Sequence, residues 1–320
     1  MKNTLNILRG RLCLLLCLGL FAACSSDDDE QTPSKKTYPL TIEVAENPLV
    51  NEGGEPVATK ATITTTSSLS AFTMNYVYGT AEPGSVTAER TTEGKWRGGA
   101  WPNDAVAPNY EVNWYAYTGG TFKRTGNVDK KPCIDFTVEE AAENQHDLLV
   151  ATALNKTWSD CKGHLSFTFD HACSAIRLYV KKATNLNGHT LSVSSIVLQN
   201  VVKQGNYFFE TESWTLTGSS TQYTLYSGSG ITLGSENYVL LNGSEDNSYL
   251  FMIPQTLTAW NPTQTLSNTY LELTCSIDGA TSQTAYIPFA ATFEKGTQHD
   301  VKINIGKNTL YSGPNTKVIP

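Results

Sequence analysis

The sequence is short of basic residues, of helical patterns and of apolar runs long enough to cross a membrane. Asp and Glu number 30 against 23 Lys and Arg, so the net charge is -7 at pH 7. A negative chain is repelled by nucleic-acid phosphates and by anionic lipid headgroups, which argues against both as partners. Neither a phosphate-cradling glycine loop nor a Gly-x-Ser-x-Gly nucleophile elbow occurs. The sequence therefore indicates neither nucleotide chemistry nor serine-hydrolase chemistry.

Helical patterns are confined to one short segment. Thr137-Val-Glu-Glu140 fits a capping box, and Ala141-Ala142 follows it, so a short helix is expected there. Helices and strands do not alternate along the sequence, which argues against a nucleotide-binding α/β fold.

Most of the chain instead alternates apolar with polar residues. Clear runs place their apolar residues at Phe72, Met74, Tyr76 and Tyr78, and at Leu271, Leu273, Cys275 and Ile277. Turn-forming pairs such as Asn187-Gly188 and Asp278-Gly279 separate runs of this kind. Period-two alternation is typical of strands with one buried and one solvated face. The sequence therefore predicts an all-β fold.

The length of 320 residues suggests two domains at about 150 residues each. We expect an N-terminal β-sandwich domain over residues 38–163 and a C-terminal one over residues 164–320. Each would be large enough to bury a core without disulfides.

The first residues have the pattern of an export signal. Lys2, Arg9 and Arg11 precede an apolar stretch at residues 12–23, which is too short to span a bilayer, and Cys24 follows it. This pattern resembles a bacterial lipoprotein signal. The resemblance implies that residues 1–23 are removed and that the Cys24 thiol carries a diacylglyceryl group. An ordinary secretory signal, with Cys24 lost or left free, is the alternative.

Residues 24–37 are expected to form a flexible tether. The run Asp27–Glu30, with small polar residues and a proline around it, cannot bury apolar area. The acidic run either simply solvates this linker or acts as a signal for the outer face of the outer membrane, as it resembles such signals in Bacteroidetes lipoproteins.

The cysteines of the mature chain are too sparse for a disulfide framework. Cys133, Cys161, Cys173 and Cys275 remain after the leader and Cys24 are set aside. An exported protein can oxidise them in three connectivities, but we expect mostly buried free thiols, because Cys275 lies in an apolar strand register. Their redox state stays open.

The sequence offers one cluster with metal-ligand residues, at Cys161, His164, His171 and Cys173. Zinc knuckles present such ligands from turns, whereas His171 and Cys173 share the parity of Leu165, Phe167 and Phe169 on one strand. We therefore expect a core histidine and thiol, with no metal and no cofactor. No spacing of carboxylates singles out an acid–base pair, so no catalytic residue is expected.

Trp96 and Trp101 lie in a Gly/Pro-rich segment. Exposed, they would form an aromatic platform for sugars, and the protein would be a glycan-binding outer-membrane lipoprotein of a polysaccharide-uptake system. Buried, they would pin the loop onto the edge of a sheet.

Several segments together resemble the fimbrillins of Bacteroidetes, the pilin-like proteins of type V pili. Asp147–Ala151 (DLLVA) and Phe169–Ile176 (FDHACSAI) resemble the family signature "DLLYA … F-x-HALSKV". Gly205–Phe208 resembles "G-x-Y-x-F", Phe251–Gln255 (FMIPQ) resembles "FLIPQ", and Phe293–Ile305 resembles the closing strand. The matches are ordered and span residues 147–305.

The resemblance implies two tandem transthyretin-like Greek-key β-sandwich domains and no enzymatic activity. It implies a structural or adhesive subunit on the cell surface, lipid-anchored in the outer membrane at least as a precursor. Its partners would be other pilus subunits, self or heterotypic, joined by strand donation at an open sheet edge. A ligand on a host or bacterial surface, and a stalk, tip or anchor position, are left open.

The resemblance also assigns roles to the two ends of the chain. The strand that occupies the acceptor groove before assembly would be Leu40, Ile42 and Val44. The donor strand would be drawn from Val301, Ile303, Ile305, Val318 and Ile319. The alternative for both is a permanent strand of their own domain.

Family stalk subunits are cleaved at an arginine after the first strand, but no arginine lies between Cys24 and Arg90. Lys60 is the basic residue of the 45–70 segment and the candidate cleavage site. Either a protease with lysine specificity acts there, or the subunit is never trimmed and serves as an anchor, minor subunit or standalone lipoprotein.

Overall fold

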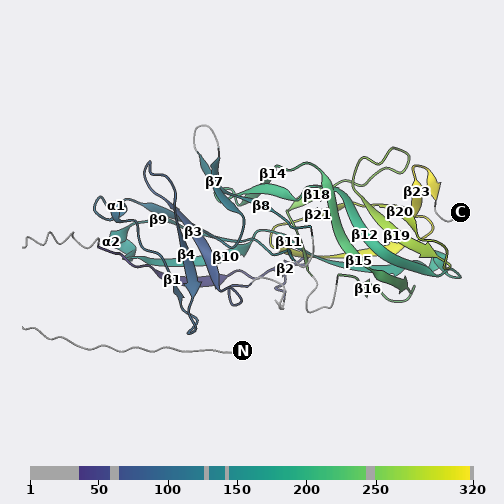
Figure 1. Cartoon of the computed structure of the whole chain (residues 1–320), viewed down its shortest axis with the longest axis horizontal. Helices are drawn as coiled ribbons and strands as arrows, with labels where there is room; N and C mark the ends of the chain where they lie inside the picture. Colours follow the sequence, from purple (N-terminus) through teal and green to yellow (C-terminus); the bar gives the residue numbers. More distant parts are fainter. Residues whose placement is uncertain (1–35, 58–64, 126–129, 141–143, 243–248, 318–320) are drawn as a thin grey trace, which may run out of the picture. The chain divides into compact units, whose positions relative to one another are not determined.

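The computed structural model describes residues 36–57, 65–125, 130–140, 144–242 and 249–317 (Figure 1). Residues 37–320 form one compact unit, and the description below concerns this unit alone. The described residues are almost entirely strands, so the all-β prediction is confirmed. The short helical elements are α1 (Asn103–Val106), α2 (Trp158–Cys161) and the 3-10 helix η2 (Thr184–Leu186). Within the described ranges, no helix is both long and apolar enough to cross a membrane.

The first part of this unit is a barrel with strand order β1-β10-β9-β6-β3-β4-β5, closed by a contact between β5 and β1 (Figure 1). The strands of the barrel are β1 (Thr41–Glu46), β3 (Ala71–Val77), β4 (Gly84–Arg90), β5 (Trp96–Arg97), β6 (Val112–Tyr117), β9 (Leu149–Lys156) and β10 (His164–His171).

One hydrophobic cluster fills the barrel. It includes Phe72 and Met74 of β3, Trp114 of β6, and Phe167 and Phe169 of β10. Along β10 these side chains alternate with exposed or half-buried ones, as the period of two requires. In β3, Asn75 and Val77 on the opposite face from Phe72 and Met74 are buried as well.

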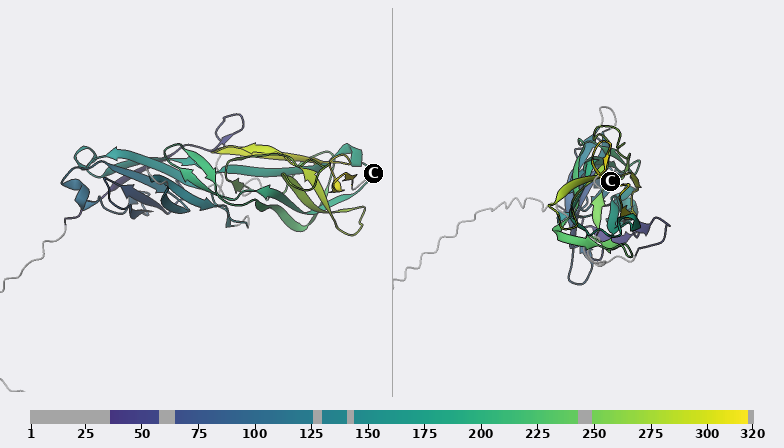
Figure 2. Two further views of the ribbon diagram at one scale, coloured as in Figure 1. Left: turned by 90° about the horizontal axis from the view of Figure 1, so that it is seen from above. Right: turned by 90° about the vertical axis from the view of Figure 1, so that its right-hand side faces the viewer.

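The remaining strands surround a second, larger cluster, and their main sheet has the order β16-β11-β22-β2, with β17 beside β11. The strands of this sheet are β2 (Val50–Asn51), β11 (Ser174–Lys182), β16 (Val239–Leu240), β17 (Leu250–Met252) and β22 (Thr297–Ile305). Figure 2 shows the yellow β22 running alongside the teal β11, with which it pairs in parallel.

A second sheet of this part has the order β15-β12-β19-β20-β23-β24. Its strands are β12 (Leu191–Val201), β15 (Thr221–Leu233), β19 (Tyr270–Ile277), β20 (Gln283–Pro288), β23 (Tyr311–Gly313) and β24 (Thr316–Lys317). Leu271, Leu273 and Cys275 of β19 are buried, as the sequence pattern predicts.

Two smaller sheets complete the fold, with orders β14-β13-β8-β7 and β18-β21. Their strands are β7 (Thr121–Thr125), β8 (Lys131–Thr137), β13 (Gln204–Phe208), β14 (Ser213–Leu216), β18 (Gln255–Leu257) and β21 (Ala291–Phe293). The hairpin β7–β8 lies between the barrel strands β6 and β9 in the sequence but belongs to a different sheet, in which β8 pairs with β13. Tyr207 of β13 lies in the larger core.

Two features bear on the expected domain boundary at residues 163/164. The strand that starts at His164 pairs with β1 and β9 of the barrel. Residues of β7–β8, such as Ile134 and Phe136, belong to the larger cluster with strands of the C-terminal part. The division into two tandem transthyretin-like Greek-key domains stays a prediction.

The helix expected from Thr137 is wrong in its first residues. Thr137 is the last residue of β8 and pairs with Gln204, and the Val138 backbone N–H donates to the Lys203 carbonyl at 2.9 Å. Val138 continues the buried series of Ile134 and Phe136, because the strand partner outweighs the local capping pattern.

Candidate functional site

The first strand is a peripheral strand of the barrel with one well-paired edge. β1 pairs in parallel with β10, from Thr41 opposite His164 to Glu46 opposite Phe169. On its other edge, the pairing with β5 among the described residues is confined to Ile42 opposite Trp96. Leu40 and Ile42 are buried, and Val44 is half-buried. From residue 43 onward, the outer edge of β1 therefore has no strand partner in the described part of the chain.

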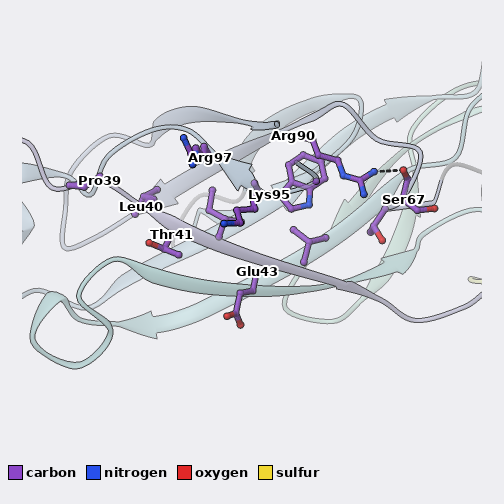
Figure 3. A pocket seen from close by; sticks show the side chains of 13 residues that line it. Pro39, Leu40, Thr41, Glu43, Ser67, Arg90, Lys95 and Arg97 are labelled. Atoms are coloured by element: carbon purple, nitrogen blue, oxygen red, sulfur yellow. Dashed lines mark hydrogen bonds between the residues drawn. The ribbon is translucent and has the colours of Figure 1, made fainter. Parts of the chain in front are cut away.

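A groove with a cavity volume of about 780 Å³ runs along this outer edge. The residues that line it are Pro39, Leu40, Thr41, Ile42, Glu43, Val44, Thr66, Ser67, Arg90, Gly94, Lys95, Trp96 and Arg97 (Figure 3). Figure 3 shows Arg90 reaching Ser67, whose carbonyl accepts a hydrogen bond from the guanidinium. Glu43 points to the other side of β1 and accepts a hydrogen bond from the Ser166 hydroxyl at 3.2 Å.

A buried ionic cluster holds the end of β1. Glu46 Oε1 lies 3.2 Å from His171 Nε2, and Glu46 Oε2 accepts the Thr66 backbone N–H at 2.5 Å. His171 Nδ1 hydrogen-bonds Asp147, whose other oxygen accepts the Cys173 backbone N–H at 3.3 Å. The His171 side chain is 1% exposed and that of Asp147 is fully buried. One histidine therefore joins the last residue of β1 to the segment that begins β9.

The electrostatics of the cluster favour a charged imidazolium. Burial alone would lower the pKa of His171, but hydrogen bonds to Asp147 and Glu46 and their negative charges raise it to about 9. Burial alone would raise the pKa of Glu46, but hydrogen bonds from His171 and from Thr66 hold it below its ordinary value. At neutral pH, the cluster is thus a positive ring between two carboxylates.

The segment after β1 enters the larger core. Leu49 is fully buried in the larger hydrophobic cluster, and β2 pairs in parallel with β22 at Val50 and Asn51. The stretch from Leu40 to Asn51 therefore contributes to both cores in turn, with Glu46 between them.

The candidate donor residues fall into two groups. Val301, Ile303 and Ile305 lie in β22, which pairs with β11 from Gln298 to Ile305 and with β2 at its start. β22 is thus paired along nearly its whole length with β11, while β2 borders only its first two residues, Thr297 and Gln298. The other two candidates, Val318 and Ile319, lie outside the described residues, as do the lipidation site Cys24 and the candidate cleavage site Lys60.

The structure does not bring the four metal-ligand candidates together. Cys161 ends α2 and is half-buried, and His164 is exposed at the start of β10. His171 is buried on the face of β10 that carries Leu165, Phe167 and Phe169, as the strand parity predicts. Cys173 is also buried, but it follows the end of β10 and belongs to the larger hydrophobic cluster. Across the described ranges, no group of three or more His, Cys, Asp and Glu side chains is arranged to hold a metal ion.

Both Trp96 and Trp101 are buried, so of the two alternatives the sugar platform is wrong. Trp96 is 9% exposed and packs against Phe72, with ring centroids 4.9 Å apart and ring planes tilted by 59°. Trp101 is 1% exposed, and its ring centroid lies 5.6 Å from that of Trp114 and 6.0 Å from that of Trp158. Both rings pack against neighbouring aromatic side chains and attach their segment to the barrel.

Among the described residues, none of the four remaining cysteines forms a disulfide. Cys133, Cys173 and Cys275 are buried and Cys161 is half-buried. Burial raises the pKa of Cys275 to about 11 and that of Cys173 well above its usual value. The buried thiols therefore have the character of small hydrophobes, as expected.

Sequence reasoning missed the role of the ionic cluster. Asp147 and His171 both fall in the segments that resemble the family signature, which was the available signal. Glu46 carries no signal of its own, because its partner lies 125 residues away in the sequence.

Comparisons with known proteins agree with this architecture. The family model described as "Fimbrillin-like" matches residues 51–318. No curated protein matches. Among solved structures, the chain is similar to a candidate cell adhesion protein from Bacteroides ovatus, at 16% identity and a TM-score of 0.50 over 86% of this chain and 95% of the other.

A candidate cell adhesion protein from Parabacteroides distasonis is similar at 8% identity, with a TM-score of 0.52 over 87% of this chain and 91% of the other. A fimbrial protein from Bacteroides vulgatus has 17% identity and a TM-score of 0.48 over 83% and 96%. At these identities, the two likenesses with TM-scores of 0.50 and 0.52 show a shared fold. The family model covers most of the chain, and the chain therefore belongs to the fimbrillin-like family.

Proposed function

We propose that this protein is a structural or adhesive subunit of a type V pilus, without enzymatic activity. In this proposal, lipid on Cys24 holds the precursor at the outer membrane, and strand donation joins the subunit to other pilus subunits. Membership of the fimbrillin-like family supports a fimbrial or adhesive role at the cell surface.

The observation that carries the strand-donation part is the position of β1. A strand that pairs along one edge and borders an open groove on the other can leave without dividing a continuous sheet. Its buried apolar contribution to the barrel is mainly Leu40 and Ile42, which stabilise the barrel by about 1.5–3 kcal/mol each. An incoming strand with the same alternation would restore both these contacts and the main-chain hydrogen bonds.

The donor in this proposal is the segment after Gly306. Removing β22 would break its pairing with β11 and β2 and expose the fully buried Ile305, so Val301, Ile303 and Ile305 are poor candidates to leave their sheet. The later segment has weaker ties, since β23 pairs with β20 at Tyr311 opposite Tyr286 and with β24 at its tip. Val318 and Ile319 belong to this segment.

Cleavage at Lys60 would separate β1 from the rest of the chain, so that an incoming strand could replace it. Identification of the N-terminus of the protein on intact cells, by mass spectrometry, tests this step. A new start near residue 61 supports trimming, whereas an acylated Cys24 alone supports a subunit that keeps its first strand and acts as an anchor or minor subunit.

A disulfide lock tests whether β1 must leave. Glu43 and Ser166 are paired residues of β1 and β10 with touching side chains on the solvent side, so Glu43→Cys with Ser166→Cys should tie the strand in place. The matched control is Thr73→Cys with Thr87→Cys, a cross-strand pair of β3 and β4 that is not proposed to separate.

We expect the first lock to abolish high-molecular-weight pilus ladders and a reductant to restore them, while the control keeps them. Deleting residues after Gly306 should likewise abolish incorporation as a donor. Ladders that persist with a verified Glu43–Ser166 disulfide would show that β1 is a permanent strand.

A further inference from the structure

The acceptor groove is the part of the barrel that β1 itself occupies, beside β10, and it differs from the surface groove along the outer edge of β1. It is apolar along most of its length and ionic at one end. β10 presents Leu165, Phe167 and Phe169 to the barrel core, and the same face ends in His171. The matching face of the first segment begins at Leu40, directly before β1, continues through Ile42 and Val44 and ends in Glu46. Ile42 and Val44 lie opposite Leu165 and Phe167, and Glu46 lies opposite Phe169. The Glu46 side chain reaches His171, the next residue on the same face of β10, so the apolar stretch ends in a carboxylate–histidine contact.

The carboxylate of Glu46 satisfies two donors at once. Its Oε1 lies 3.2 Å from His171 Nε2, and its Oε2 accepts the Thr66 backbone N–H at 2.5 Å. A strand with an apolar or basic residue at this position would leave both donors without an acceptor. The buried imidazole would then depend on Asp147 alone for compensation. An unpaired buried donor is costly, so this position discriminates between strands more sharply than the apolar positions do.

We propose that the His171–Asp147 pair is the specificity position of the groove, and that any strand that occupies it must carry a carboxylate where β1 has Glu46. The sequence requirement on the donor is apolar residues at alternate positions followed, on the same face, by Asp or Glu. This inference rests on the proposed function, since it concerns the strand that replaces β1.

The need for a carboxylate at the position of Glu46 excludes the protein's own candidate donor segment as the strand that fits this groove. Residues 307–320 read KNTLYSGPNTKVIP, with lysines at 307 and 317 and no Asp or Glu. A second copy of this chain would bring no side-chain carboxylate to His171. The partner that fits is a different subunit whose donor strand carries an acidic residue, so the contact on this side of the protein is heterotypic.

Peptide exchange into the full-length chain tests the proposal. A specific protease site replaces residues 58–63, the folded protein is cut there, and fluorescent peptides then compete for the groove. The reference peptide has the sequence of residues 37–51, which spans β1 and β2. Its variant Glu46→Gln removes the carboxylate at the ionic end. The matched control is Glu43→Gln, a residue of the same strand that points to the solvent side.

We expect the reference peptide to enter the groove, Glu46→Gln to bind at least tenfold more weakly, and Glu43→Gln to bind within about threefold of the reference. A peptide of residues 307–320 should bind no better than Glu46→Gln. In the uncut protein, Glu46→Gln should also move the NMR titration of the His171 ring to lower pH, which checks the contact without any strand exchange.

The outcomes separate the two ideas. If the two Gln variants bind equally well, or if the 307–320 peptide matches the reference, the specificity proposal is wrong while strand replacement stands. If even the reference peptide never enters the cut protein, β1 is not replaceable and both ideas are wrong.

Discussion

Deprotonation of His171 should weaken the folded state at mildly alkaline pH. In the folded protein, the pKa of His171 is raised to about 9 because the hydrogen bonds to Asp147 and Glu46 outweigh the burial that would lower it. In the unfolded chain, a histidine has its ordinary pKa of 6.5. A raised folded-state pKa gives stabilisation that is complete below pH 6.5 and is lost as the pH rises through about 9.

The magnitude follows from the gap between the two pKa values. At 1.36 kcal/mol for each pKa unit, the gap from 6.5 to about 9 corresponds to about 3 kcal/mol. This is a large share of the 5–15 kcal/mol that typically separates folded from unfolded domains. The free energy of unfolding of the wild type should therefore fall by about this amount, relative to a variant without the charge, between pH 6.5 and pH 9.5.

The assay is urea unfolding at a series of pH values, followed by tryptophan fluorescence, for the wild type and His171→Gln. The glutamine can still hydrogen-bond Asp147 but carries no titrating charge, so the difference between the two proteins should shrink as the pH rises. His164→Gln removes an exposed histidine from the same strand and serves as the control. A difference between wild type and His171→Gln that stays constant across this pH range would refute a charged His171.

Three further predictions concern the core and the thiols. Trp101→Ala should lower the free energy of unfolding by about 3–5 kcal/mol. Trp101→Phe should lower it much less, because the buried indole N–H has no hydrogen-bond partner to lose. Urea unfolding measures both losses, and equal losses would contradict the argument. Tyr223→Phe should cost about 1–3 kcal/mol, because the buried hydroxyl bonds the Phe251 carbonyl; calorimetry that finds no loss would contradict this. In the folded protein, a thiol reagent followed by mass spectrometry should label Cys161 well before the fully buried Cys173; the reverse order would show that the segment between β10 and β11 opens readily.

The sequence predicts the faces of strands better than it predicts their partners. The parity of β10, with Leu165, Phe167 and Phe169 inward, follows from the period of two, and so does that of Leu271 and Leu273 in β19. The parallel pairing of β1 with β10 joins residues more than 120 positions apart. Local patterns carry no information about such a pairing, which depends on how the whole chain closes the barrel.

The candidate site was predictable to the extent that it depended on the faces of strands. The alternation of Leu40, Ile42 and Val44 predicts a strand, and the structure has one at Thr41–Glu46. The same alternation says nothing about Glu46, because a carboxylate on the inner face becomes informative only when its partner His171 is known. The prediction of a helix from Thr137 was wrong for a related reason, because it used local sequence alone. In the structure, Thr137 and Val138 pair with residues 203–204, which are distant in the sequence.

The route of the first segment constrains how assembly can proceed. Ile42 lies in the barrel core, Leu49 lies in the larger core, and Glu46 is tied to His171 between them. A donor that filled the barrel groove alone would leave the site of Leu49 empty and β22 without its partner β2. In the proposed mechanism, a strand that replaces the whole first segment has to fill both cores and to meet the ionic cluster between them. Under this proposal, a strand with a carboxylate that reaches His171 binds with the smallest loss of hydrogen bonds at the cluster.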